Sequence, residues 1–304
     1  MLVEKVVYRG WPRCYRLAND ETELIVTGDV GPRIIRFGFI GDSNEFGEHA
    51  GQVGRVGGSE WRIYGGHRLW HSPEDKVRTY YPDNEPVEIF EENGTVRVVQ
   101  PTEPTTGIQK EMALTLEAAN RVEVRHLLRN VGPWPVELAP WALSVMAQGG
   151  VGIVPQPTKA HPDRLLPNRT VVLWPYTDMT DERIHWGSRF IILHQDRNAR
   201  SRTKIGLNSS DGWAAYLRRD HLFLKSFEYV EGARYPDYGC SLEMYTDEQI
   251  LELETLGPLQ LLAPGDVAEH IEHWFLFRGI KGGEDEESIA QTVMPLVAAA
   301  RGDF

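Results

Sequence analysis

The sequence predicts an all-β protein whose strands run mostly antiparallel, and three stretches carry this prediction. Residues 87–99 hold an Asn93-Gly94 pair between two alternating runs, which favours a tight hairpin because both central residues of such a turn take positive φ. Residues 110–128 form a second pair of runs around a turn near Asn120. Residues 240–277 indicate two more strands, joined through a Gly-Pro turn and then a Pro-Gly turn.

The segments before the first hairpin are shorter. Residues 24–27 and 34–40 are typical of strands on either side of a turn at 28–33. Residues 41–60 are rich in Gly, Ser, Asn and Glu, which predicts a loop.

The second half of the chain alternates between strands and one long irregular stretch. A Pro-rich link at 132–135 leads into a strand at 136–146, and residues 156–189 combine prolines, aromatics and scattered charges, which indicates a loop. Further strands are expected at 190–193, 213–217 and 221–227.

A short helix is expected at the C-terminus. The acidic residues of 283–287 favour a helix start, and apolar residues follow at helical spacing: Ile289, Val293, Leu296, Val297 and Ala300. Pro295 should bend or shorten this helix. Because no internal repeat interrupts the pattern, we expect one domain over residues 1–304, built as a large sandwich or a barrel.

Composition limits the possible partners. A formal net charge of -12 over 304 residues, without a Lys- or Arg-rich run, argues against nucleic acid. No run approaches the roughly 20 apolar residues of a membrane span, and the N-terminus has no apolar core of signal-peptide length. The two cysteines, Cys14 and Cys240, form no zinc-binding spacing. We therefore expect a cytoplasmic protein with no metal, no cofactor and no membrane or nucleic-acid partner.

Two carboxylates in the last predicted hairpin form the first candidate site. Glu252 and Glu254 alternate with leucines, so both project from one face of a strand. A carboxylate on a rigid strand just before a turn suits a general base. The alternative is a solvated outer face of an edge strand.

Residues 65–74 form the second candidate site. His67 and His71 are four positions apart, which places them on one face of a strand or a helix, and Arg68 and Trp70 add a cation and a flat apolar surface. Sugars stack on such tryptophans because one face of a sugar ring carries C–H groups. The alternative is a glycine turn followed by a core tryptophan and two surface histidines.

A third group, His270 and His273 with neighbouring glutamates, has a spacing close to that of a metal site. Positions three apart on a strand face opposite sides, so the two imidazoles should diverge. A structural role is therefore expected for this pair.

Four short motifs resemble the galactose mutarotase-like superfamily, the aldose 1-epimerases and their relatives. These motifs are Leu253-Glu254-Thr255 followed by Leu262-Ala263-Pro264-Gly265, Glu243-Met244-Tyr245-Thr246 upstream of it, Gly31-Pro32-Arg33-Ile34, and the run from Gly66 to Glu74. The last run is most similar to a bacterial branch of the superfamily.

The resemblance implies a β-supersandwich and an open groove that binds a sugar. It also implies mutarotation, in which a Glu takes the proton of the anomeric hydroxyl while a His protonates the ring oxygen. Glu254 matches the position of the base. The superfamily's His is expected where this sequence has Trp141, so either His67, His71 or His161 supplies the acid, or the chain binds sugar without epimerising it.

The expected ligand is a small sugar or sugar phosphate, bound by a monomer or a homodimer. The residues predicted to line the groove are Arg68, Trp70, Arg78, Trp141, His161, Lys225, Asp237, Glu243 and Tyr245. One alternative is a sugar-binding module without catalysis. Another is a lyase or hydrolase for acidic sugars, which would be favoured if Arg68, Arg78 and Lys225 converged to pair a substrate carboxylate.

Overall fold

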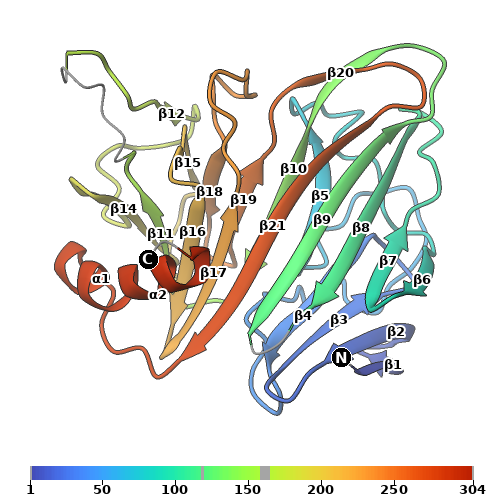
Figure 1. Cartoon of the computed structure of the whole chain (residues 1–304), viewed down its shortest axis with the longest axis horizontal. Coiled ribbons are helices and arrows are strands. Elements are labelled where there is room, and N and C mark those ends of the chain that lie inside the picture. Colours follow the sequence, from blue (N-terminus) through green and yellow to red (C-terminus); the bar gives the residue numbers. More distant parts are fainter. Residues whose placement is uncertain (1, 118–119, 158–164, 303–304) are drawn as a thin grey trace.

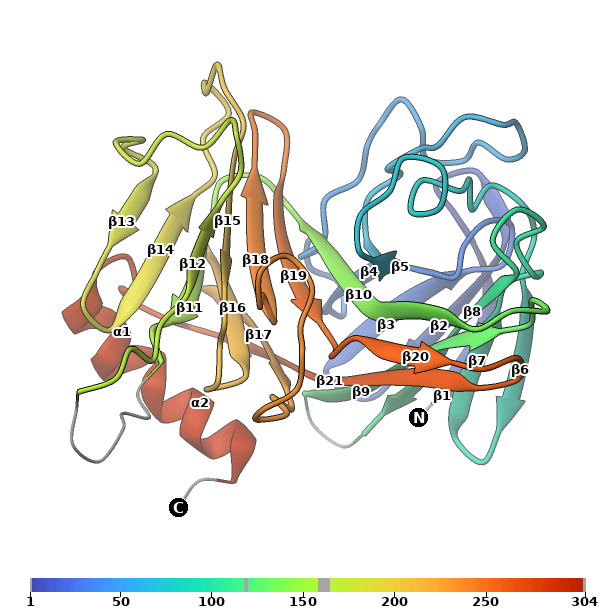
Figure 2. The same ribbon diagram turned by 90° about the horizontal axis from the view of Figure 1, so that it is seen from above.

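The alternating runs fold into two large antiparallel sheets that pack against each other (Figures 1 and 2). The computed structural model describes residues 2–117, 120–157 and 165–302. In the first sheet the strands lie in the order β1 (Leu2–Tyr8), β2 (Trp11–Ala18), β3 (Thr22–Thr27), β4 (Arg33–Phe39), β5 (His67–Ser72), β10 (Val136–Met146), β19 (Leu251–Leu256), β18 (Leu242–Thr246), β15 (Thr203–Leu207) and β12 (Val171–Leu173), and β20 (Gln260–Leu262) pairs with the start of β10.

The second sheet faces the first. Its strands lie in the order β13 (Ile184–Trp186), β14 (Phe190–His194), β11 (Val151–Pro155), β16 (Trp213–Arg218), β17 (His221–Phe227), β21 (Val267–Arg278), β9 (Arg121–Asn130), β8 (Ile108–Leu116), β7 (Thr95–Val99) and β6 (Glu88–Glu92). The predicted all-β sandwich architecture is therefore confirmed.

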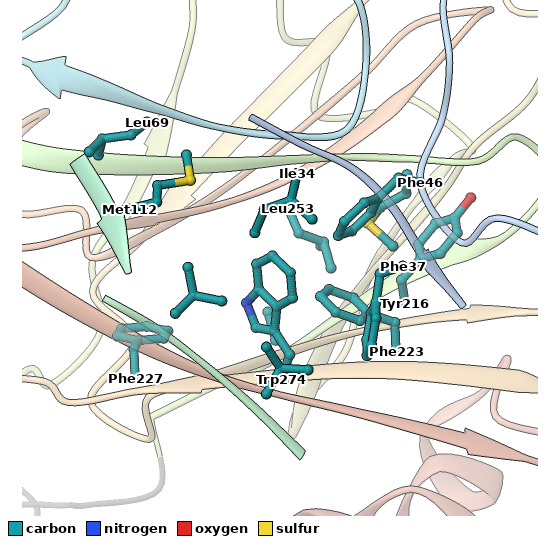
Figure 3. Close-up of a cluster of buried hydrophobic side chains, with 14 of the residues drawn as sticks. Ile34, Phe37, Phe46, Leu69, Met112, Tyr216, Phe223, Phe227, Leu253 and Trp274 are labelled. Atoms are coloured by element: carbon teal, nitrogen blue, oxygen red, sulfur yellow. The ribbon is translucent and has the colours of Figure 1, made fainter. Parts of the chain in front are cut away.

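The main hydrophobic core lies between the two sheets (Figure 3). Phe37 and Leu253 reach it from the first sheet, and Met112, Phe223 and Trp274 reach it from the second. Along each strand every second side chain points into this layer, as the period of two requires. The alternate side chains of the first sheet are therefore left to face away from the core.

Two short helices cover the outer face of the second sheet. In α1 (Glu286–Thr292) the Asp285 side chain caps the first turn, and α2 (Met294–Arg301) begins with a proline in its first turn. The helices bury Ile289, Val293 and Val297 against the strands beneath them. The predicted C-terminal helix is confirmed, and it divides in two just before Pro295.

The Asn93-Gly94 hairpin is also confirmed, with φ values of 51° and 81° at its central residues. The sequence did not predict β1, β2, β11 or β15 as strands, and the short strands β12 and β13 lie within residues 156–189, where only a loop was expected. Pro12 in β2 and the Lys204 and Gly206 positions in β15 break the apolar alternation on which the predictions rest. β19 lies between β10 and β18 with all six residues buried, so the alternative of a solvated edge strand is wrong.

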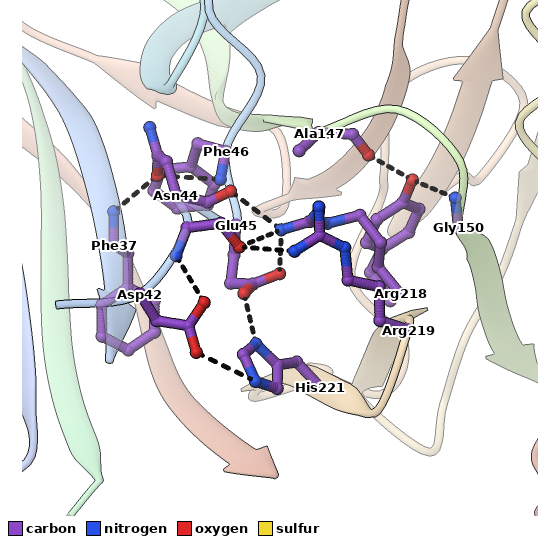
Figure 4. A network of polar contacts seen from close by, with 12 residues as sticks. Phe37, Asp42, Asn44, Glu45, Phe46, Ala147, Gly150, Arg218, Arg219 and His221 are labelled. Carbon is purple, nitrogen blue, oxygen red and sulfur yellow. Dashed lines mark hydrogen bonds and ion pairs between the residues drawn. The ribbon is translucent and has the colours of Figure 1, made fainter. Parts of the chain in front are cut away.

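A buried polar network joins the segment after β4 to the β16–β17 hairpin (Figure 4). The Glu45 carboxylate contacts the Arg218 guanidinium at 3.0 Å and His221 Nδ1 at 2.7 Å, and Glu45 is only 1% exposed. Arg218 also donates to the backbone carbonyl of Asn44 at 3.0 Å. These contacts fix residues 43–47 against the second sheet.

Replacing Glu45 with alanine should lower the free energy of unfolding by about 3–5 kcal/mol, because the buried Arg218 charge loses its partner. Urea unfolding monitored by tryptophan fluorescence measures this change. Glu91→Ala, at an exposed position of β6, is the control and should change the stability by less than about 0.5 kcal/mol. Equal stability of both variants would contradict the structural role of the network.

Candidate functional site

A cavity of about 550 Å³, called here the main cavity, lies on the face of the first sheet that points away from the second sheet. Five neighbouring strands build its floor with side chains from the outward positions: Arg68 and Trp70 of β5, Trp141 and Leu143 of β10, Glu252 and Glu254 of β19, Tyr245 of β18, and Lys204 of β15. The cavity volume lies within the range of about 300–1,000 Å³ that is common for small-molecule sites.

Aromatic rings form the walls. On one side Trp61, Trp70 and Tyr80 contact one another with ring centroids 4.8 to 5.4 Å apart. On the other side the Trp174 ring lies over β15, where Gly206 leaves the necessary space, because a Cβ there would lie 3.2 Å from the ring. Flat rings on facing walls match the C–H faces of a sugar ring.

Glu254 lies at the bottom of this aromatic cavity and is only 1% exposed. Its Oε2 accepts hydrogen bonds from Trp141 Nε1 at 2.9 Å and from Lys204 Nζ at 2.8 Å. Its Oε1 has no hydrogen-bond partner among the residues that the structure describes. One oxygen of Glu254 is therefore fixed by the protein, and the other is a buried acceptor whose hydrogen-bonding capacity the described residues do not use.

Lys204 connects Glu254 to a second buried carboxyl group. Its ammonium lies 2.7 Å from Glu243 and 4.7 Å from the ring centroids of both Trp141 and Trp174. Burial alone would lower the pKa of Lys204, but Glu243 and Glu254 together hold this pKa well above its ordinary value. Lys204 therefore stays charged at the floor of the main cavity.

Burial raises the pKa of Glu243 well above its ordinary value, and the neighbouring Glu254 and Asp237 raise it further. Burial also raises the pKa of Asp237. These two groups lie beneath Lys204 and do not line the main cavity.

Arg68 and Glu252 form the second ion pair of the floor, with 2.8 Å between guanidinium nitrogen and carboxylate oxygen. The Arg68 guanidinium stacks on Trp70 at 4.4 Å from the ring centroid. Burial raises the pKa of Glu252, and the charge of Glu254 raises it further, whereas Arg68 acts in the opposite direction.

The structure brings together Glu254, Arg68, Trp70, Trp141 and Tyr245, all of which line the main cavity. Arg78 is half-buried in the loop after β5 and does not line it. His161 lies outside the described residues.

His67, His71 and Lys225 face the space between the two sheets and not the main cavity. On β5 the positions alternate, so Arg68 and Trp70 point outward while His67 and His71 point inward. Lys225 Nζ is fully buried and pairs with Glu272 at 2.8 Å. Neither histidine is therefore positioned to protonate a ligand over Glu254.

His67 instead belongs to a buried network. His126 Nδ1 donates to the backbone carbonyl of His270 at 3.0 Å, so His126 Nε2 accepts a hydrogen bond from His67 Nε2 at 2.7 Å. His67 Nδ1 then accepts from the Ser144 hydroxyl at 2.8 Å. The side-chain nitrogen and oxygen atoms of His67, His126 and Glu272 that could ligate a metal lie within 4.8 Å of one another. The hydrogen bonds of the two histidines and the ion pair between Glu272 and Lys225 already explain why these groups lie together.

Several lining residues were not predicted from the sequence: Lys204, Trp61, Tyr80 and Arg202. Lys204 gave no signal in the sequence, because the burial of Thr203–Leu207 follows only from the folded sheet. Trp61 and Tyr80 come from loops, whose positions no periodicity reveals.

The sequence matches no protein-family model and none of the curated proteins searched. Solved structures do match. A candidate aldose 1-epimerase from Klebsiella pneumoniae has a TM-score of 0.61 and 12% identity over 98% of this chain and 87% of its own. A galactose mutarotase-like protein from Lactobacillus casei has a TM-score of 0.54 and 9% identity, covering 86% and 99% of the two chains.

The chain has the galactose mutarotase-like fold. A third structure, a galactose mutarotase-like protein from Clostridium acetobutylicum, has a TM-score of 0.52 and 10% identity over 91% of this chain and 98% of its own. These matches confirm the resemblance inferred from the short motifs. At identities of 9 to 12% they show a shared fold. No helix among the described residues is long and apolar enough to cross a membrane.

The burial of the histidines predicts that the stability of the protein depends on pH. Burial lowers the pKa of His270 to about 3, while an unfolded histidine titrates near 6.5. The unfolded chain therefore takes up a proton that the folded chain does not, and stability falls as the pH drops from 6.5 towards 3. Between pH 7 and pH 5 this one group should lower the free energy of unfolding by about 2 kcal/mol.

Urea unfolding at the two pH values measures this loss. His270→Gln cannot titrate, and its amide can still donate to the Thr255 hydroxyl, which lies 2.8 Å from His270 Nε2. The variant should lose less stability than the wild type over the same interval, because the other buried histidines are common to both. An equal loss in the two proteins would contradict the assignment of His270 as a neutral buried group.

Proposed function

We propose that the protein binds a sugar in the main cavity and interconverts its anomers by acid–base opening of the ring, as in an aldose 1-epimerase. The supporting observation is the state of Glu254. One of its oxygens is held by Trp141 and Lys204, and the other lacks a partner among the described residues at the base of an aromatic cavity. The galactose mutarotase-like fold of the chain agrees with this proposal, although fold alone does not decide function.

In the proposed reaction, Glu254 Oε1 takes the proton of the anomeric hydroxyl. The bond between C1 and the ring oxygen breaks, the ring oxygen receives a proton, and an open-chain aldehyde forms. Rotation about the C1–C2 bond followed by the reverse proton transfers closes the ring to the other anomer. Lys204 and Trp141 keep Glu254 oriented during both transfers.

The proposal assigns the second proton transfer to Glu252. It lies two positions from Glu254 on the same face of β19, and its pKa is raised by burial and by Glu254. A carboxyl group with a raised pKa holds its proton at higher pH and can therefore act as the acid. Arg68 would stabilise the carboxylate that remains after the proton has left.

Sugar binding without catalysis is the second candidate, and one observation favours it. Trp141 stands where the superfamily's acid histidine is expected, and an indole cannot act as that acid. Its Nε1 instead donates a hydrogen bond to Glu254. An acidic-sugar enzyme is less well supported. Arg78 and Lys225 do not line the main cavity, and Arg68 and Lys204 already contact carboxyl groups of the protein.

Glu254→Gln should reduce catalysed anomer exchange by at least about 100-fold, because the amide cannot accept the proton. Exchange is measured by NMR across a panel of aldoses and sugar phosphates. Glu111→Gln, on β8 of the other sheet and paired with Arg97, is the matched control and should keep the wild-type rate. Sugar-induced line broadening that is unchanged in Glu254→Gln, with no exchange in the wild type, would instead support binding without catalysis.

Glu252→Gln tests the assigned proton donor. The amide cannot protonate the ring oxygen, so exchange should fall by about 100-fold or more while sugar binding persists. In the wild type the rate should also fall as the pH rises through the elevated pKa of Glu252, since the donor must carry a proton. A wild-type rate in Glu252→Gln would remove Glu252 from the mechanism and leave Glu254 unaffected.

A further inference from the structure

A second cavity of about 460 Å³ opens directly beside the main cavity. The two share four lining residues, His49, Ile63, Gln249 and Ile250. The two cavities are therefore neighbours that share one border. Each part alone falls within the range of about 300–1,000 Å³ that is common for small-molecule sites.

The second cavity is built on fixed parts of the fold. Phe46 and Gly47 line it, and they belong to the segment that the Glu45 network holds in place (Figure 4). Ala147 lines the opposite side, and its backbone carbonyl accepts a hydrogen bond from the Tyr216 hydroxyl. A site held in this way needs little reorganisation to accept a ligand.

The chemistry of the second cavity suits a neutral sugar unit. Ile63 and Ile250 offer apolar surface, and Gln148 and Gln249 add amide groups that hydrogen-bond to hydroxyls. His49 lies at the junction of the two cavities, and its Nδ1 is buried without a hydrogen-bond partner among the described residues. None of the described residues that line this cavity is a lysine or an arginine, so it offers no partner for a phosphate or a carboxylate.

We propose that the second cavity binds a second sugar unit, so that the preferred ligand is a disaccharide or longer oligosaccharide with a free reducing end. This inference rests on the proposed function, because the reducing-end ring would occupy the main cavity over Glu254. The next unit would cross the junction at His49 and lie beside Ala147 and Ile250.

The test compares monosaccharides with disaccharides that carry the same reducing-end ring. Glucose is compared with maltose, cellobiose and lactose, xylose with xylobiose, and mannose with mannobiose, by NMR titration of the wild type. At least one disaccharide should bind about tenfold or more tightly than its monosaccharide, since a second ring buries further apolar surface.

Two variants are designed to fill the second cavity, and neither position lines the main cavity. Ala147→Trp introduces a large side chain just after β10, and Ala50→Trp introduces one at an exposed position of the loop after β4. Both should remove the disaccharide advantage and leave monosaccharide binding unchanged, and retained monosaccharide binding also shows that the variants fold. Ala233→Trp, which lines neither cavity, is the matched control and should keep the advantage.

Equal affinities for each monosaccharide and its disaccharide, unaltered by filling the second cavity, would overturn the inference and leave the proposed function standing. A failure of every sugar to bind would overturn the proposed function, and this inference with it.

Discussion

Lys204 is the residue on which the geometry of the main cavity depends. A buried ammonium is tolerated only when it is paired, and Lys204 meets this requirement through Glu254 on β19 and Glu243 on β18. The same group lies against the rings of Trp141 and Trp174. One charge thus orients a carboxylate and two aromatic rings that come from distant parts of the sequence, and the second oxygen of Glu254 stays without a hydrogen-bond partner among the described residues.

The period of two along a β-strand divides the first sheet into two faces with different chemistry. On β19 Leu251, Leu253 and Thr255 point towards the second sheet, whereas Glu252 and Glu254 point into the main cavity and Leu256 packs with Trp70 and Trp141 on that outer face. On β5 the histidines take the inner face, and Arg68 takes the outer one. The buried network around His67 and the main cavity are therefore built on the same strands but from different side chains.

Much of the fold could be predicted from the sequence, because it is expressed in local patterns such as the Asn93-Gly94 turn and the alternation in β19. The site was predictable only in part. Grouping His67 with Arg68 followed their adjacency in the chain, although a strand sends neighbouring residues to opposite faces. Lys204 could not be assigned, since its partners Glu243 and Glu254 lie about 40 to 50 residues later and meet it only through sheet pairing.

The most direct measurement is a crystal structure of the protein with an aldose bound. The account predicts a sugar ring between the aromatic walls, with its anomeric hydroxyl within hydrogen-bond distance of Glu254 Oε1 and its ring oxygen towards Glu252. A sugar bound outside the main cavity, or bound there with its anomeric carbon turned away from Glu254, would contradict the account.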